Sequence, residues 1–192
     1  RTREDAIYYV LEGISKTQRH PNVGLTFAAT LRAILRHDPD VVMVGEIRDL
    51  ETAKVAFEFA STGRPVLSTV HTNSAAGAIQ RLRDMGIEPY VIAATLKAVI
   101  AQRLVRRLCE HCRKPHASTP EELAMFGLDA VSAPQFWRPV GCMACGNSGY
   151  NGRLGVYELI SVDGALRDLI RADGSEDAIQ DMAFSRYDTL FT

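Results

Sequence analysis

A run of four apolar residues, Val41–Val44, is the feature that most restricts how this chain can fold. The run leads directly into the sequence GEIRD, which begins at Gly45. A strand buried on both faces of a parallel sheet has a continuous apolar sequence, whereas a half-buried strand alternates. In open α/β sheets, ligands bind just beyond the carboxyl ends of such strands. We therefore expect Glu46 to lie at the rim of a ligand site.

Segments with helical patterns alternate with this strand and with a second strand in PVLSTVHTNS, which begins at Pro65. Each helix is recognised by one or more local signals, namely a possible N-cap, apolar residues at helical spacing, and a glycine or proline at one end. The expected helices are Thr26 to just before Pro39, Glu51–Thr62, Ser74–Gly86 and Tyr90–Leu104. Two short strands, DAIYYVL and GISKTQ, are expected before them, within residues 5–18. This alternation predicts βαβ units and a parallel sheet with flanking helices.

The composition changes after Leu108, because the next 47 residues hold all four cysteines and a Gly-rich run. Within them, EELAMF is expected to form a helix. From Val156 the chain returns to a strand, VYELI, followed by amphipathic helices near 164–172 and 175–185. We therefore predict an α/β domain over residues 1–105, a cysteine-containing subdomain over 106–155 and a C-terminal helical segment over 156–192.

The overall composition fits a globular protein, with 46% hydrophobic residues among 192 and a net charge of −1. That charge argues against a protein that clamps nucleic acid over its whole surface. No apolar stretch reaches the roughly 18 residues of a transmembrane helix, and the first residues lack the apolar core of a signal peptide. Because the sequence starts without Met, we interpret it as part of a longer protein.

The two strands end in similar polar groups. The first presents Glu46, and the second presents hydroxyls and the imidazole of His71. A carboxylate can polarise a water or hold Mg²⁺ through water, and the other groups can orient a terminal phosphate. The alternative is that these are ordinary polar strand ends exposed to solvent. The pair together favours a metal–phosphate site.

The four cysteines form two CxxC pairs, Cys109 with Cys112 and Cys142 with Cys145. Two such pairs can complete the tetrahedral S₄ site that structural Zn²⁺ prefers. Disulfide or redox chemistry is the competing interpretation. Nearby His111 and His116 are possible spare ligands, but we expect neither to bind.

Two long segments, LRAILRHDPDVVMVGEIRDLETA and TGRPVLSTVHTNSAAGAIQRLRDMGIEP, resemble the Walker B region and His box of the secretion ATPase superfamily. These proteins are the hexameric motors of type II secretion and type IV pilus assembly. The resemblance extends from about residue 4 to about residue 170, and it implies a RecA-like ATPase domain. The tetracysteine insert resembles the assembly branch of the family.

The resemblance also implies roles for individual residues. Glu46 matches the Walker B glutamate, Glu4 the Asp-box glutamate and His71 the second histidine of the His box, which are expected to act in catalysis. Nucleotide contacts are expected from Asp5, Arg32, Arg36, Arg64 and Arg103. The pattern departs from the family at Ala6, Tyr8 and Arg3 in the Asp box, and Arg64 stands where the His box usually begins with histidine.

The phosphate-binding motif G-x-x-x-x-G-K-[ST] does not occur in the 192 residues. That loop supplies the backbone N–H groups and the lysine that hold the β- and γ-phosphates. In the family it lies upstream of the segment that matches here. We therefore expect these residues alone to be inactive as an ATPase.

The resemblance further implies ATP and Mg²⁺ as ligands, structural Zn²⁺, and a homo-hexamer of the full-length protein. It implies cytoplasmic partners and an inner-membrane platform, with a peripheral location at the inner membrane. One alternative is a non-catalytic zinc module that docks membrane partners. A weaker alternative is nucleic-acid binding by the basic run over residues 97–114, which lacks aromatic residues for base stacking.

Overall fold

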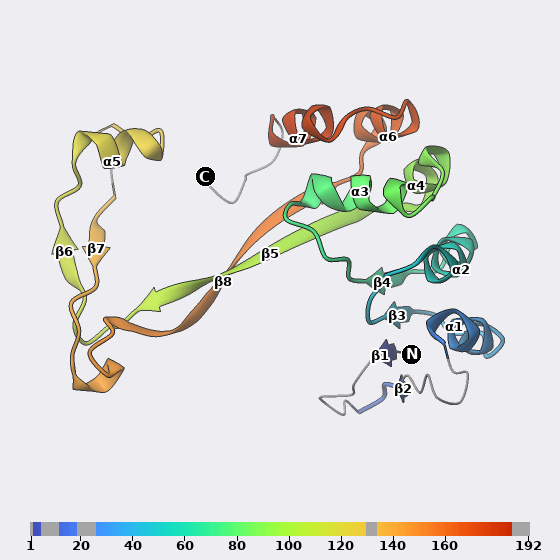
Figure 1. Ribbon diagram of the computed structural model, residues 1–192, viewed down its shortest axis with the longest axis horizontal. Helices are drawn as coiled ribbons and strands as arrows, with labels where there is room; N and C mark the ends of the chain where they lie inside the picture. Colours follow the sequence, from blue (N-terminus) through green and yellow to red (C-terminus); the bar gives the residue numbers. More distant parts are fainter. Residues whose placement is uncertain (1, 5–11, 19–25, 130–133, 186–192) are drawn as a thin grey trace. The chain divides into compact units, whose positions relative to one another are not determined.

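The computed structural model describes residues 2–4, 12–18, 26–129 and 134–185 (Figure 1). They divide into two compact units. The first runs to Val99 and resumes at Ile160, and the second comprises Ile100–Leu159. Within the described ranges, every helix is too short or too polar to cross a membrane.

A four-stranded parallel sheet forms the base of the first unit, with the order β2-β1-β3-β4. Its strands are β1 (Thr2–Glu4), β2 (Lys16–Gln18), β3 (Val42–Val44) and β4 (Val66–Ser68). Val42 and Val44 are fully buried, but Met43 is only partly buried and Val41 is 44% exposed. The prediction of a strand buried on both faces is therefore only half met. The strand expected in GISKTQ is β2, whereas the one expected in DAIYYVL lies outside the described residues.

Three helices of the first unit begin at side-chain caps that the sequence contains. Each cap oxygen accepts a hydrogen bond from a backbone N–H that has no partner inside the helix. Thr26 caps α1 (Phe27–Leu35), Asp49 caps α2 (Leu50–Ser61) and Ser74 caps α3 (Ala75–Asp84). The caps predicted at Thr26 and Ser74 are confirmed. Glycines with positive φ follow α2 at Gly63 and α3 at Gly86, where L side chains are strained.

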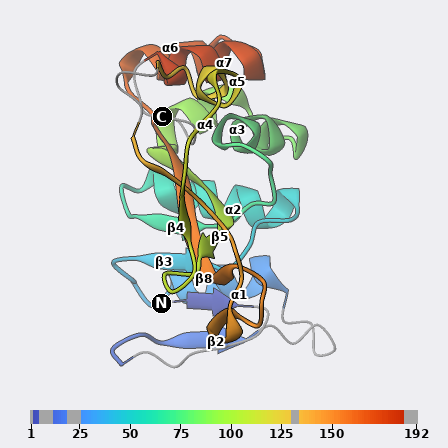
Figure 2. The ribbon, with the colours of Figure 1, turned by 90° about the vertical axis from the view of Figure 1, so that its left-hand side faces the viewer.

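The helix predicted over Tyr90–Leu104 is wrong beyond Thr95. Helix α4 covers Pro89–Thr95, and the chain then forms the long strand β5 (Ala98–Leu108). Its partner in a two-stranded sheet is β8 (Tyr150–Ser161). Lys97 O accepts a bond from Val162 N at one end, and Cys109 N donates to Gly149 O at the other. The two strands are therefore antiparallel neighbours (Figure 2).

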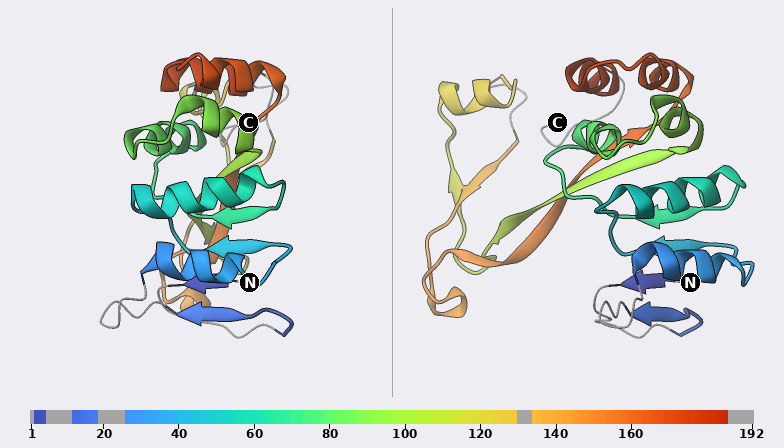
Figure 3. Two further views of the ribbon diagram at one scale, coloured as in Figure 1. Left: turned by 90° about the vertical axis from the view of Figure 1, so that its right-hand side faces the viewer. Right: turned by 45° about the vertical axis from the view of Figure 1, so that its right-hand side comes forward.

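The last two helices are α6 (Gly164–Arg171) and α7 (Glu176–Phe184). Helix α6 packs against α4, and α7 packs against α3 (Figure 3). They bury Leu166, Ile170 and Ile179 in the first unit. The helices predicted near 164–172 and 175–185 are thus present, as part of the α/β unit and not as a third segment.

The second unit contains a short antiparallel strand pair and the cysteines. The pair is formed by β6 (Lys114–His116) and β7 (Phe136–Arg138). Helix α5 (Pro120–Met125) corresponds to the predicted EELAMF helix, and Thr119 caps it in a reciprocal bond with Glu122. The 3₁₀ turn η2 (Met143–Cys145) contains the last cysteine.

Candidate functional site

The ends of β3 and β4 are joined by hydrogen bonds just beyond the sheet. Ile47 N donates to Thr69 O at 3.0 Å. The Thr69 hydroxyl donates to Gly45 O at 2.7 Å. Because parallel strands end at the same edge of a sheet, these bonds hold the two polar segments side by side.

Glu46 lies at this edge between two basic groups. Its Oε2 accepts from Arg48 Nε and lies at the same distance, 2.6 Å, from Arg48 Nη2. Its Oε1 lies 3.1 Å from His71 Nε2. The Glu46 side chain is only 13% exposed, whereas that of His71 is 88% exposed. The adjacency of Glu46 and His71 that the sequence predicts is therefore present.

The two oxygens of Glu46 differ in the strength of their attachment. Two nitrogens of Arg48 contact the single oxygen Oε2, which holds that oxygen by opposite charge. The contact of Oε1 is to an exposed imidazole that can turn away and meet a ligand. The arrangement can accept a hydrogen bond from a water at Oε1 and present the ring to an anionic group.

Arg48 was not among the residues selected from the sequence. The signal was present, because residues i and i+2 of an extended segment point to the same side. Two residues after a strand-end glutamate, a basic residue is placed to pair with that glutamate.

The other predicted catalytic residue, Glu4, lies at the end of β1. In the β1–β3 register Thr2 stands opposite Met43 and Arg3 opposite Val44. The backbone of Glu4 therefore reaches the same edge of the sheet as Glu46. Asp5 lies outside the described residues.

The four arginines predicted to contact nucleotide lie in different places. Arg32 of α1 pairs with Glu51 of α2 at 2.9 Å, and Arg36 is exposed at the C-cap of α1. Arg64 precedes β4 and pairs with Asp38, which precedes β3. That pair stands at the opposite end of the parallel strands from Glu46. Arg103 lies on β5 in the second unit.

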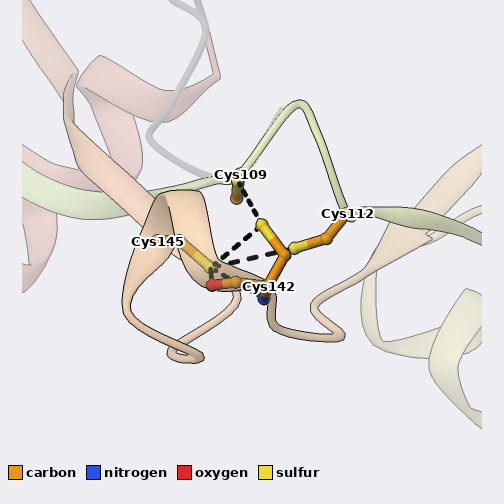
Figure 4. Close-up of side chains that lie close together, drawn as sticks. All are labelled: Cys109, Cys112, Cys142 and Cys145. Carbon is orange, nitrogen blue, oxygen red and sulfur yellow. Dashed lines mark hydrogen bonds between the residues drawn. The ribbon is translucent and has the colours of Figure 1, made fainter.

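The four cysteines converge in the second unit (Figure 4). Their Sγ atoms all lie within 4.8 Å of one another, and all four are free of disulfides. The Sγ of Cys109 is 3.9 Å from that of Cys142, and that of Cys112 is 3.9 Å from that of Cys145. In a tetrahedral site with Zn–S bonds of about 2.3 Å, the sulfurs stand about 3.8 Å apart. The donor set therefore fits a zinc ion, and the disulfide alternative has no support here.

Backbone N–H groups point at these sulfurs, as they do at bound thiolates. Gly141 N donates to the Sγ of Cys112, and both Cys142 N and Gly149 N donate to that of Cys145, each at 3.3 Å. Burial raises the pKa of Cys145, but the two backbone donors and two neighbouring thiols outweigh it and lower that pKa to about 6. Burial and neighbouring thiols raise the pKa of Cys142 to about 11. The two thiols of this CxxC pair thus release their protons one at a time, because ionisation of one opposes ionisation of the other.

Glycines allow the turns around this cluster. A Cβ on Gly149 would lie 2.6 Å from Pro139 Cβ, and one on Gly141 would lie 2.8 Å from Asn147 O. Both residues also have positive φ. The nearby His116 pairs with Glu122 at 2.9 Å.

Comparison with known sequences identifies long matches over nearly the whole chain. A family model described as "Type II/IV secretion system protein" matches residues 1–192. "Type II secretion system protein E" of Aeromonas hydrophila is 54% identical over 179 residues, which cover 93% of this chain and 36% of that protein. "Type IV pilus assembly ATPase PilB" of Thermus thermophilus is 49% identical over 185 residues, which cover 95% and 21%. The chain spans about a third or less of the length of these relatives.

Solved structures share the fold. The pilus retraction motor PilT with bound ADP aligns with a TM-score of 0.66 at 29% identity, over 98% of this chain and 45% of that one. The ATPase DotB of Legionella pneumophila aligns with a TM-score of 0.60 at 24% identity, over 96% and 42%. The predicted fold class is confirmed, namely part of a RecA-like α/β sheet with flanking helices and a tetracysteine insert.

Proposed function

The chain belongs to the type II/IV secretion system protein family, and from this premise we propose that it is the C-terminal part of a hexameric motor that hydrolyses ATP. The motor drives type II secretion or type IV pilus assembly, as the names of its relatives suggest. Because the chain spans only part of those relatives, the activity belongs to the full-length protein.

The pairing of Glu46 with His71 is the observation that carries this proposal. Glu46 orients the attacking water through Oε1 while Arg48 holds Oε2. His71, exposed beside it, meets the terminal phosphate. A carboxylate that is fixed before the reaction begins does not have to reorganise during it. Such preorganisation, together with positioning of the reactants, is the main source of catalysis in phosphoryl transfer.

Further residues are proposed as ligands of the metal ion and of the nucleotide. We propose that Glu4 and Glu46 hold Mg²⁺ through water, and that ion would neutralise charge on the phosphates. Asp5, Arg32, Arg36 and Arg103 remain candidates for nucleotide contacts, whereas Arg64, at the opposite end of the strands from Glu46, would have to contact the nucleotide of a neighbouring subunit. Arginines that reach a neighbour's nucleotide would make a ring of subunits necessary for activity.

We also propose that the four cysteines hold a structural zinc ion. A closed shell of four thiolates leaves no position for a substrate. The second unit then docks partners of the secretion machinery at the inner membrane.

The test of ATP hydrolysis uses the full-length protein. We expect Glu46→Gln to lower kcat by about 100-fold, the usual order for loss of a general base, while ATP binding is kept. Steady-state phosphate release and binding of a fluorescent ATP analogue measure the two quantities. The 192 residues alone are expected to release phosphate at a negligible rate.

The matched control is Glu88→Gln, an exposed glutamate whose side chain makes no cap bond to α4. This variant should retain the kcat of the unaltered protein. Equal activity of the two variants would remove the proposed role of Glu46.

A further inference from the structure

Helix α3 begins four residues after His71, and its N-cap, Ser74, also contacts Glu176 in the first turn of α7. The Ser74 hydroxyl accepts a hydrogen bond from Gly77 N at 2.9 Å, as an N-cap does. The same hydroxyl donates to Glu176 Oε1 at 3.2 Å. A hydroxyl can make both bonds at once, since it has one donor and two acceptor positions. Glu176 therefore orients the group that starts α3.

The Glu176 carboxylate is well suited to this position. It lies in the first turn of α7 and touches the N-cap of α3, so it stands near the positive ends of two helix dipoles. Gly77 leaves room for it, because a Cβ there would lie 3.0 Å from Glu176 Oε1.

Arg83, near the other end of α3, fixes the turn that leads into α7. Its side chain is only 8% exposed, and it donates to Gly174 O at 2.6 Å and to Ile170 O at 3.0 Å. Its Nε lies 3.3 Å from Asp173 Oδ1, an ion-pair distance without a directed hydrogen bond. Asp173 has a φ of +57°. The α6–α7 turn and Glu176 are thus both tied to α3.

His71 depends on such anchors because its side chain is 88% exposed and little packing holds it. Before His71, Thr69 is bonded to Gly45. After it, the Thr72 hydroxyl donates to Ser74 O at 3.0 Å. Ser74 therefore ends the loop that carries the imidazole, and Glu176 holds Ser74.

We propose that Glu176 is a positioning residue for His71, acting through the Ser74 cap to keep the imidazole beside Glu46. This inference rests on the proposed ATPase function, because it assigns a partner to the residue that meets the terminal phosphate. The C-terminal helices thereby contribute to hydrolysis without touching nucleotide.

The test measures kcat and KM for ATP in the full-length protein. Glu176→Ala should lower kcat about tenfold, because small misplacements of a reacting group are costly, and should change KM less than twofold. Glu176→Gln keeps an acceptor for the Ser74 hydroxyl and should recover most of kcat. The matched control is Asp177→Ala, which removes an exposed charge from the same turn of α7 and should retain kcat.

Two further variants separate positioning from loss of fold. In a His71→Ala background, Glu176→Ala should cause no further loss of kcat, since its effect passes through the imidazole. Gly77→Ala would place its Cβ 2.9 Å from Ser74 Oγ and 3.0 Å from Glu176 Oε1, so it crowds both the cap and its carboxylate partner and should lower kcat. The melting temperature, measured alongside, reports any change in stability.

The outcomes distinguish the two proposals. If His71→Ala lowers kcat but Glu176→Ala behaves like Asp177→Ala, this inference is overturned and the ATPase proposal stands. A further loss from Glu176→Ala in the His71→Ala background would equally overturn it, as a general structural effect. If His71→Ala leaves kcat unchanged, the role of His71 and this inference fall together.

Discussion

At the scale of single residues, the direction of the strands decides which predicted groups meet. Glu46 and His71 follow β3 and β4, and they are in contact. Arg64 precedes β4 and pairs with Asp38 instead. The contact was predictable because parallel strands end at one edge. The resemblance to a family placed Arg64 among the nucleotide ligands, but its position before the strand puts it at the far end.

Arg48 gives a prediction at this scale. Arg48→Ala should lower kcat of the full-length protein about tenfold, because the Glu46 carboxylate loses the two contacts that hold its Oε2. Arg48→Lys keeps the charge but not the planar guanidinium, so its kcat should lie between those of Arg48→Ala and the unaltered protein. Steady-state ATPase assays with Arg81→Ala, an exposed arginine of α3, as control would measure this. An unchanged kcat in Arg48→Ala would mean that His71 alone orients Glu46.

At the scale of elements, local signals predicted the helices better than the strands. The caps at Thr26 and Ser74 are properties of a few neighbouring residues, so they can be recognised from the sequence. Strand β5 is different, since its partner β8 begins more than 40 residues later. The Ala, Val and Leu content of Tyr90–Leu104 is compatible with a helix, and distant pairing decides otherwise beyond Thr95.

The four-cysteine cluster gives a prediction about how the affinity for zinc depends on pH. Cys142, with its pKa raised to about 11, is protonated at neutral pH and must release its proton to bind metal. At least one proton is therefore released per zinc bound, and apparent affinity should rise at least about tenfold per unit between pH 6 and 8. Competition with a chromophoric chelator measures it. A flat profile, or well under one zinc per reduced chain, would contradict the proposed site.

At the scale of the whole molecule, the chain divides differently from the three consecutive parts expected from sequence. The C-terminal helices pack on α3 and α4, so the first unit is built from both ends of the chain. The amino-acid composition changes visibly at residue 109, but composition carries no information on where a later helix packs. Such contacts between distant segments are decided by side-chain packing that no local pattern records.

The single tryptophan allows the two units to be followed separately. Trp137 lies in the second unit, with Arg113 stacked 4.7 Å from its ring centre. Removing zinc with a chelator should lower the melting temperature reported by tryptophan fluorescence, because metal binding contributes to the stability of that unit. The circular-dichroism transition of the helices, which lie mainly in the first unit, should shift much less. Equal shifts by both probes would indicate one cooperative unit.

The hydrogen bond between Lys97 and Val162 has an evolutionary consequence. The chain departs from the first unit and returns to it at adjacent points, along two neighbouring strands. A subdomain inserted between two adjacent points can be gained, lost or replaced by a tight turn, and the topology of the first unit stays the same. Related proteins can therefore differ in this subdomain while they keep the α/β unit.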